Sequence, residues 1–300
     1  MRILYVAKHN SGDNDDEGAI AHGLRELGHE VLCVDETVRG RYILQHTNYD
    51  FVLFHKWQDT ATLKRLEMPK VFWYFDLVDF PDPMIAGRNR NRMEWMQRTI
   101  PEVRVGFCTD GDWVNKDRSG KLVRLLQGAD QRIAGTGLQQ TSRRLKLLFT
   151  GTRKGGLGRE SFVSEMATNY CGGFTHLGDK NKIHGRALAD VIRSADIVVA
   201  PDAPITDHYW SNRVYLMLGF GAFLMHPFAS TLVRHYTDEK EIVYYRDREE
   251  LHSKIKYYSE RPEERERIAA AGLRRTLEQH TYKHRCQQLV NILKERGVVK

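Results

Sequence analysis

The feature that most constrains the fold is an alternation of short apolar runs with helix-like segments, which begins at the first residues. Residues 2–7 form an apolar run that ends in a polar loop, and residues 17–27 follow with large aliphatic side chains at helical spacing. A second helix-like segment spans 60–67. Further apolar runs lie at 31–34, 51–54, 71–75 and 103–108. Strands separated by helices predict a parallel sheet with right-handed crossover connections.

The alternation breaks at residues 127–141, which are rich in Gly, Gln and Thr and show no hydrophobic periodicity. We place the domain boundary there, with a first domain at 1–135 and a second at 136–300. The second domain has expected strands at 145–150, 197–200, 223–226 and 242–245, and expected helices at 160–170, 214–218, 249–259, 263–278 and 282–296. We expect the last helix to pack back on the first domain. The expected fold class is α/β, with two Rossmann-like, doubly wound parallel-sheet domains that face each other across a cleft.

The charge balance of the chain is mildly basic. It contains 46 Lys and Arg residues against 39 Asp and Glu residues, which gives a formal net charge of +7. This balance suits an anionic ligand, from a nucleoside diphosphate up to nucleic acid. It is equally compatible with surplus Lys and Arg on a solvated surface, so charge alone leaves the ligand class open.

The cysteine content and the apolar runs indicate the compartment. The four cysteines, at positions 33, 108, 171 and 286, form no C-x-x-C pair and match no zinc spacing, which predicts free thiols in a reducing environment. The N-terminus begins as a strand and lacks the long apolar stretch of a signal peptide. The longest apolar run, 216–225, is shorter than the roughly 20 residues that span a bilayer. We therefore expect a cytoplasmic protein with no membrane span.

A glycine-rich, basic loop follows the strand expected at 145–150. Gly151 opens the loop, and Arg153, Lys154 and Arg159 place positive charge just before a helix. Backbone N–H groups and the positive end of a helix dipole suit a phosphate at such a position. The loop matches neither the Walker A pattern nor G-x-G-x-x-G. Taken alone, these residues are consistent with a diphosphate site or with a solvated turn.

A second polar segment, 207–213 (DHYWSNR), precedes an apolar helix. Ser211 or Asn212 suits a helix cap, and Arg213 suits bidentate binding of a phosphate. A helix cap with a surface ion pair is the alternative interpretation of the same residues.

With these motifs in place, the chain resembles the spore-maturation-type (CgeB-like) glycosyltransferases, a group within the GT-B fold. The matching stretches are 212–215 (NRVY), 221–224 (GAFL), 241–245 (EIVYY), 262–265 (PEER), 268–272 (IAAAG) and 280–285 (HTYKHR), with weaker similarity at 126–130 (LQGAD) and 149–151 (FTG). The resemblance covers about half of the chain well and the first domain only loosely. These motifs together are fairly specific for the family and say little about the substrate.

The resemblance implies a transferase that moves a sugar from a nucleoside-diphosphate sugar, with UDP-sugar the first expectation, to a hydroxyl group of a protein or small molecule. The donor-binding residues it implies are Gly151, Arg153, Lys154, Arg159, Asn212, Arg213 and Gly221. Such enzymes usually need no metal and no cofactor, because fixed cations and helix N–H groups stabilise the leaving diphosphate. Asp110 and Asp112 form a D-x-D pair like the metal motif of another glycosyltransferase fold, but they follow a first-domain strand.

Two positions depart from the family pattern. Leu216 stands where related families carry a Glu that hydrogen-bonds the nucleotide ribose. His208 stands where retaining relatives carry a paired Glu. The ribose contacts and the stereochemical course therefore do not carry over to this chain.

Candidate catalytic groups on the acceptor side lie after expected strands of the first domain. A general base must reach the acceptor hydroxyl, and a carboxylate or an imidazole at a strand end suits that role. Asp76 is the first choice, because it directly follows the run at 71–75, and Asp79 and His55 are the next. His9 and Asp13, after the first strand, are further candidates.

Three other functions remain open. The basic stretch at 88–98 and the net positive charge permit a glycosyltransferase that acts on modified bases of phage DNA, although no nucleic-acid motif is present, so this is not favoured. The Leu at position 216 permits a non-catalytic protein that binds nucleotide-sugars. A nucleotide-sugar epimerase shares the expected fold.

Overall fold

The structure is a computed structural model of the 300-residue chain, and it describes residues 1–9, 15–80, 86–136, 145–153, 158–178, 183–201 and 206–300. The chain divides into two compact units. Unit 1 comprises Met1–Gln127 and Tyr282–Lys300, and unit 2 comprises Gly128–Thr281. The division therefore lies eight residues before the boundary at 135 that the composition indicated. The reason is local, since the Ala129 N–H donates to the His280 carbonyl oxygen at 2.8 Å and ties this stretch into unit 2.

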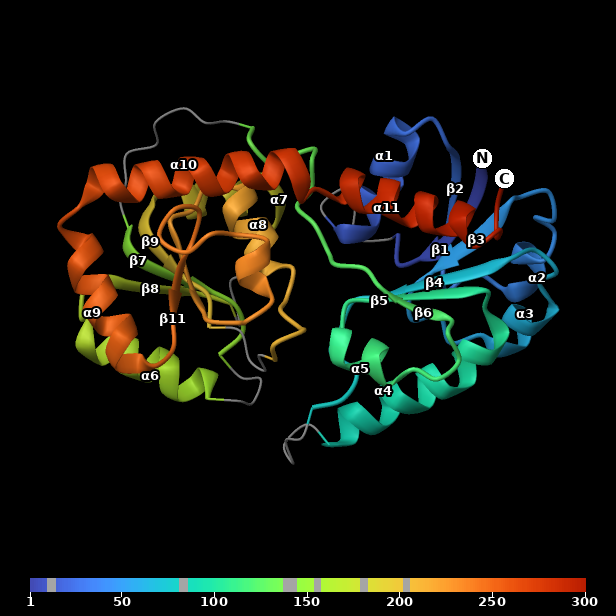
Figure 1. Cartoon of the computed structure of the whole chain (residues 1–300), viewed down its shortest axis with the longest axis horizontal. Helices are drawn as coiled ribbons and strands as arrows, with labels where there is room; N and C mark the ends of the chain where they lie inside the picture. Colours follow the sequence, from blue (N-terminus) through green and yellow to red (C-terminus); the bar gives the residue numbers. More distant parts are fainter. Residues whose placement is uncertain (10–14, 81–85, 137–144, 154–157, 179–182, 202–205) are drawn as a thin grey trace. The chain divides into compact units, whose positions relative to one another are not determined.

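Unit 1 contains a six-stranded sheet in the order β2-β1-β3-β4-β5-β6, and all of its strand pairs are parallel (Figure 1). The strands are β1 (Arg2–Ala7), β2 (Glu30–Asp35), β3 (Phe51–Phe54), β4 (Lys70–Tyr74), β5 (Val105–Cys108) and β6 (Leu122–Arg124). The helices are α1 (Asp16–Glu26), α2 (Gly40–Ile43), α3 (Thr60–Arg65), α4 (Ala86–Thr99), α5 (Gly111–Lys116) and α11 (Tyr282–Glu295), with a 3-10 turn η2 (Ile100–Glu102).

Side chains alternate between the two faces of this sheet, as strand geometry requires. Tyr5 and Trp73 lie on the face that packs against α1 and α11. Val6 and Phe72 lie on the opposite face, in the core formed with α3 and α4. Both faces are apolar, so the strands read as continuous hydrophobic runs, which is typical of a parallel sheet covered on both sides.

The last helix, α11, belongs to unit 1 and lies beside α1 (Figure 1). Cys286, Leu289 and Leu293 are fully buried in the same core as Ile20 and Leu24 of α1. The chain therefore returns to unit 1 after completing unit 2, and its final helix completes the hydrophobic core of the first unit.

Unit 2 contains a five-stranded parallel sheet in the order β11-β10-β9-β7-β8. The strands are β7 (Leu145–Thr150), β8 (Phe174–Leu177), β9 (Ala195–Val199), β10 (Leu224–Pro227) and β11 (Val243–Tyr245). The helices are α6 (Arg159–Asn169), α7 (Gly185–Arg193), α8 (Arg213–Gly219), α9 (Arg248–Ser259) and α10 (Pro262–Gln279), with a 3-10 turn η3 (Leu232–Arg234). Phe149, Met225 and Tyr245 share one apolar core with side chains of α6 and α9.

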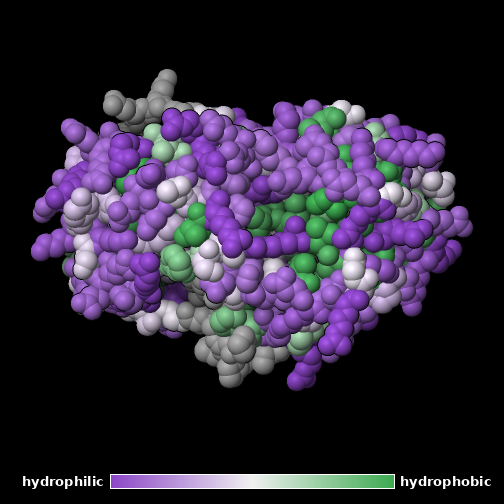
Figure 2. Space-filling view, in the orientation of Figure 1, coloured by the Kyte–Doolittle hydropathy of each residue, from purple (hydrophilic) through white to green (hydrophobic). Residues whose placement is uncertain are grey.

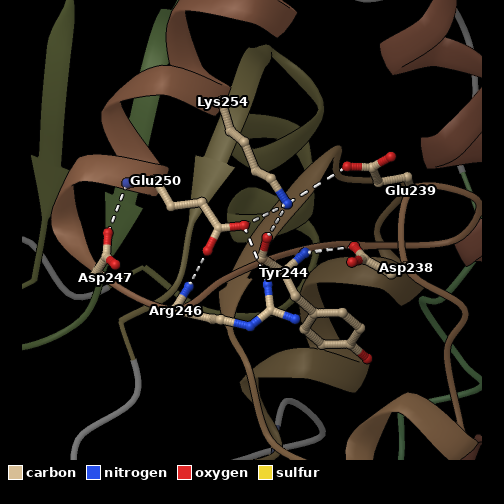
Figure 3. A network of polar contacts seen from close by, with 7 residues as sticks. All are labelled: Asp238, Glu239, Tyr244, Arg246, Asp247, Glu250 and Lys254. Carbon is tan, nitrogen blue, oxygen red and sulfur yellow. Dashed lines mark hydrogen bonds and ion pairs between the residues drawn. The ribbon is translucent and has the colours of Figure 1, made fainter.

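Polar side chains satisfy the outer backbone groups of the edge strand β11 (Figure 3). The Tyr244 N–H donates to Asp238 Oδ1 at 2.9 Å, and the Tyr244 carbonyl oxygen accepts from Lys254 Nζ at 2.7 Å. Lys254 also forms ion pairs with Glu250 at 3.1 Å and with Glu239 at 3.5 Å. Occupying these backbone groups keeps the edge strand from pairing with another chain.

One face of the molecule is mostly hydrophilic, and the apolar side chains in view gather mainly over the sheet of unit 1 (Figure 2). In the part of the chain that the structure describes, no helix is long and apolar enough to cross a membrane. The predicted α/β class with two parallel sheets is confirmed.

Substitution of Leu289 tests the contribution of α11 to unit 1. We expect Leu289→Ala to lower the free energy of unfolding of unit 1 by about 2–4 kcal/mol, because it removes contacts at a fully buried site and leaves a cavity. Tryptophan fluorescence in a urea titration reports mainly on this unit, since Trp57, Trp73, Trp95 and Trp113 lie in it. The exposed Lys294→Ala on the same helix is the control. Equal urea midpoints for the two variants would contradict the packing described here.

Candidate functional site

A pocket of about 310 Å³ opens at the carboxyl edge of the unit 2 sheet. Its walls come from the ends of β7 and β8, from the start of α7 and from the start of α8. In open parallel sheets, ligands bind beyond the carboxyl ends of the strands. The volume lies in the range of small-molecule sites. This pocket is therefore the candidate functional site of unit 2.

Part of the pocket lining is polar. Thr150, Gly151 and Thr152 contribute to it from the end of β7, while Asn212 and Arg213 contribute from the start of α8. The Arg213 guanidinium carbon lies 6.0 Å from the centroid of the Phe149 ring, at the outer limit of a cation–π contact. A permanent cation beside hydroxyl and amide groups suits an anionic ligand group.

The lining also has an apolar part. It consists of Leu177, Ile183, Leu188, Leu216 and Met217, and the polar residues Ser211 and His184 line the same pocket. Leu216 and Met217 follow Arg213 by three and four residues on α8, so the three side chains share one face of the helix. A ligand with an anionic part and a flat or apolar part matches this arrangement.

Two glycines hold the turns after β7 and β8 against each other. A Cβ atom at Gly178 would lie 1.9 Å from the Gly151 carbonyl oxygen, which no side chain allows. Gly151 has a φ of +148°, and a Cβ atom there would lie 3.1 Å from Arg213 Nη2. The Gly151 N–H donates to the Leu177 carbonyl oxygen at 2.8 Å, so this backbone group is already bonded within the protein. The contribution of Gly151 to the pocket is the space that its missing side chain leaves for Arg213.

His176 of β8 also bonds to the turn that follows β7. Its Nε2 donates to the Gly151 carbonyl oxygen at 2.7 Å. Its ring stacks on Phe149 with a centroid separation of 5.3 Å and an interplanar angle of 12°. The Phe149 ring therefore lies between the stacked His176 ring and the more distant guanidinium of Arg213.

The structure brings some of the predicted donor residues together and separates others. Gly151, Asn212 and Arg213 line the pocket. Arg153 lies against α6, where it donates to Ser164 Oγ at 3.0 Å. Arg159 donates to Oγ1 of the pocket residue Thr152 at 3.4 Å. Gly221 lies after α8 and is not part of the lining, and Lys154 lies outside the described residues.

The predicted acceptor-side residues gather at the carboxyl edge of the unit 1 sheet. Asp76, directly after β4, forms ion pairs with Lys56 and with Arg92, the latter at 3.6 Å. Asp79 forms an ion pair with Lys116 at 3.7 Å. Both carboxylates are about one-third exposed, so they lie at the surface of this edge. The other two candidates are His9, which also follows β1 here, and Asp13, which lies outside the described residues.

His55 is buried beneath this edge. Its Nδ1 donates to the Trp73 carbonyl oxygen at 2.6 Å, and its Nε2 accepts from the Tyr5 hydroxyl at 2.5 Å. Burial lowers the pKa of His55 to about 4, so the ring is neutral at pH 7. With both ring nitrogens occupied inside the protein, His55 supports the strand ends around it.

Glu17 is a titratable group that the sequence analysis used only as the start of a helix. It lies half-buried in the first turn of α1, at the same carboxyl edge of unit 1. Burial, reinforced by the neighbouring charges of Asp16 and Asp15, raises its pKa to about 7. The run Asp15–Glu17 is visible in the sequence, but the burial that shifts the pKa is a property of the tertiary structure.

The D-x-D pair has a structural role at its first residue. Asp110 is buried and caps α5 by accepting from the Trp113 N–H at 3.1 Å, and it also accepts from the Val78 N–H at 2.9 Å. Within the residues that the structure describes, no three His, Cys, Asp or Glu side chains are grouped as metal ligands.

These features define the class of the protein. Two parallel-sheet units, with a pocket at the carboxyl edge of the second, form a GT-B fold, which solved glycosyltransferases share. Anabaena Alr3699/HepE, solved with UDP and glucose, has a TM-score of 0.66 at 11% identity, with 98% of this chain and 100% of that chain covered. A glycosyltransferase from Rickettsia africae ESF-5 has a TM-score of 0.64 at 12% identity, with 98% of each chain covered. AviGT4, a glycosyltransferase involved in avilamycin A biosynthesis, has a TM-score of 0.59 at 14% identity, with 98% of this chain and 97% of that chain covered.

The family follows from the sequence of the second half. Residues 142–291 match the model of the glycosyl transferase-like family, which is half of the chain. The chain belongs to this family. No curated protein matches the sequence.

Substitution of Gly178 tests the contact between the two turns. We expect Gly178→Ala to distort the pocket, because the added methyl group displaces the Gly151 turn, and to weaken binding of UDP, the ligand proposed for the pocket below, by about tenfold or more. Gly173→Ala, before β8, is the matched control, since its Cβ atom meets its nearest neighbours at 3.7 Å and 3.8 Å. Isothermal titration calorimetry with UDP measures both variants. Unchanged affinity in Gly178→Ala would show that the turns do not form the pocket.

The raised pKa of Glu17 predicts a pH-dependent effect on stability. Between pH 4.5 and about 7 the folded state holds a proton that the unfolded chain releases, so stability falls as pH rises through this window. Glu17→Gln removes the charge, and we expect it to stabilise unit 1 by about 1–3 kcal/mol at pH 8. The gain should disappear at pH 4. A urea titration at both pH values measures it, and a gain that is equal at pH 4 and pH 8 would contradict the assignment.

Proposed function

We propose that this protein transfers a sugar from a nucleoside-diphosphate sugar to a hydroxyl group of a protein or small-molecule acceptor. The observation that carries the proposal is the unit 2 pocket of about 310 Å³, which Arg213, Asn212 and the Gly151 turn line together. All of these residues lie within the family match. Within the family, the motifs of the second half support the spore-maturation-type group.

The polar part of the lining would hold the diphosphate. As the sugar leaves, it becomes oxocarbenium-like and negative charge builds on the diphosphate. The Arg213 guanidinium, which lies beside the Phe149 ring, would stabilise that charge. The apolar part would hold the nucleoside. UDP-sugars are the first donors to test, because Anabaena HepE is solved with UDP.

The acceptor would bind at the carboxyl edge of unit 1. Asp76 is the first candidate for the general base that takes the proton of the acceptor hydroxyl, and Asp79 is the second. His55 is a weaker candidate, since both of its ring nitrogens are bonded within the protein. The proposal includes no metal and no cofactor, because the guanidinium supplies the positive charge that the leaving group needs. We also propose that the protein acts in the cytoplasm.

Substitution of Arg213 tests the donor site. We expect Arg213→Ala to raise the dissociation constant for UDP by about 10–100-fold, because a hydrogen bond to a charged group contributes about 1.5–3 kcal/mol. Arg186→Ala, on the exposed face of α7, is the matched control and should bind UDP like the wild type. Isothermal titration calorimetry measures all three proteins. Equal affinities for Arg213→Ala and Arg186→Ala would refute the donor site.

Turnover assays separate the alternatives. Consumption of a nucleotide-sugar that depends on an added acceptor supports the transferase. Conversion of the nucleotide-sugar without any acceptor indicates an epimerase, and binding without turnover indicates a non-catalytic protein. Duplex DNA binding that weakens steeply with salt would favour the nucleic-acid acceptor.

A further inference from the structure

Trp210 and Tyr215 flank the segment 211–213, whose three residues line the pocket of unit 2. Trp210 lies in the loop before α8, and Tyr215 is the third residue of that helix. Both side chains are only 1% exposed, and the Trp210 indole N–H donates to the Tyr215 hydroxyl oxygen at 3.0 Å. A hydrogen bond between two buried side chains therefore spans the segment that carries the Arg213 cation.

The start of α8 lacks the usual means of fixing a helix end. Asn212 is the N-cap residue, and its side chain makes no capping hydrogen bond. Capping side chains normally bond to N–H groups of the first turn and hold the chain where the helix begins. In α8 the bond from Trp210 to Tyr215 joins a residue before the cap to a residue of the first turn. This bond therefore restrains the backbone at Asn212 and Arg213.

The bond is anchored on the side of α8 that faces away from the pocket. Tyr215 follows Arg213 by two residues, so the two side chains lie on different faces of the helix, and neither Tyr215 nor Trp210 lines the pocket. Between ring centroids, Tyr215 lies 5.7 Å from His280, and Trp210 lies 5.6 Å from His235. The two histidine rings are 5.4 Å apart. These contacts and the hydrogen bond link the four side chains in a closed circuit, which holds the bond in place.

We propose that Trp210 and Tyr215 are positioning residues of the donor site, which hold Asn212 and Arg213 in the geometry that binds a diphosphate. A binding segment that is ordered before the ligand arrives loses less conformational entropy on binding, so its affinity is higher. This inference rests on the proposed donor site and adds to it two residues that do not touch the ligand.

The first test removes only the hydroxyl group. Tyr215→Phe keeps the ring and deletes the oxygen that accepts from Trp210. Isothermal titration calorimetry is expected to show that this variant binds UDP about 3–10-fold more weakly than the wild type does, which is the effect of losing one such hydrogen bond. Tyr244→Phe is the matched control. Tyr244 is also 1% exposed, its hydroxyl donates to the Tyr236 carbonyl oxygen at 3.0 Å, and the variant is expected to bind UDP like the wild type.

A double-mutant cycle shows whether Tyr215 acts through Arg213. In an Arg213→Ala background the guanidinium that the bond positions is absent, so adding Tyr215→Phe is expected to weaken UDP binding by less than about twofold. The full loss in that background would indicate a general loss of packing and would overturn the positioning role. Trp210→Phe removes the donor of the same bond and is expected to weaken UDP binding as well, so the test does not depend on one variant.

The outcomes separate this inference from the function on which it rests. Wild-type affinity in Tyr215→Phe or in Trp210→Phe overturns the positioning role and leaves the donor site intact. A loss in Tyr244→Phe equal to that in Tyr215→Phe also overturns it. Failure of the wild type to bind UDP at millimolar concentration overturns the proposed function, and this inference with it. Circular dichroism of each variant confirms that the fold is retained.

Discussion

The pocket of unit 2 depends on the contact between two backbone turns, one after β7 and one after β8. The contact exists because Gly178 has no Cβ atom, which would otherwise lie 1.9 Å from the Gly151 carbonyl oxygen. The same carbonyl accepts from His176, whose ring stacks on Phe149, and Phe149 contacts the guanidinium of Arg213. The cation of the pocket is thus positioned from the backbone outward, through contacts within the protein. Such preorganisation is what stabilisation of a developing charge requires.

The carboxyl edges of the two sheets carry different chemistry. In unit 2 this edge combines the Arg213 cation with an apolar wall, which suits a ligand that is anionic at one end and apolar at the other. In unit 1 the edge carries the carboxylates Asp76 and Asp79 with their cationic partners, together with the protonatable Glu17. Under the proposed function this difference is a division of labour, since a diphosphate leaving group needs positive charge and an acceptor hydroxyl needs a proton acceptor.

Much of the fold could be predicted from the sequence, because strands buried on both faces are visible as unbroken apolar runs. The strand β8 could not be predicted in this way, because it lies at a sheet edge, is only half-buried and contains the polar residues Thr175 and His176. The helix α4 could not be predicted either. Its buried side chains Trp95 and Met96 follow a stretch rich in Arg and Asn, so the sequence shows no apolar stripe. For the site, Gly151, Asn212 and Arg213 could be selected from motifs. Gly178 follows β8 and Ile183 precedes α7, two elements that the apolar runs did not predict.

One helical turn separates two kinds of surface within the pocket. Arg213 brings a permanent positive charge, and under the proposed function it binds the phosphate groups, which are the same in every nucleoside diphosphate. Leu216 lies three residues further along α8 and brings an apolar surface without charge. A change at position 216 would therefore alter the apolar part of the lining, while the Gly151 turn and Arg213 keep the geometry that the proposed leaving diphosphate requires.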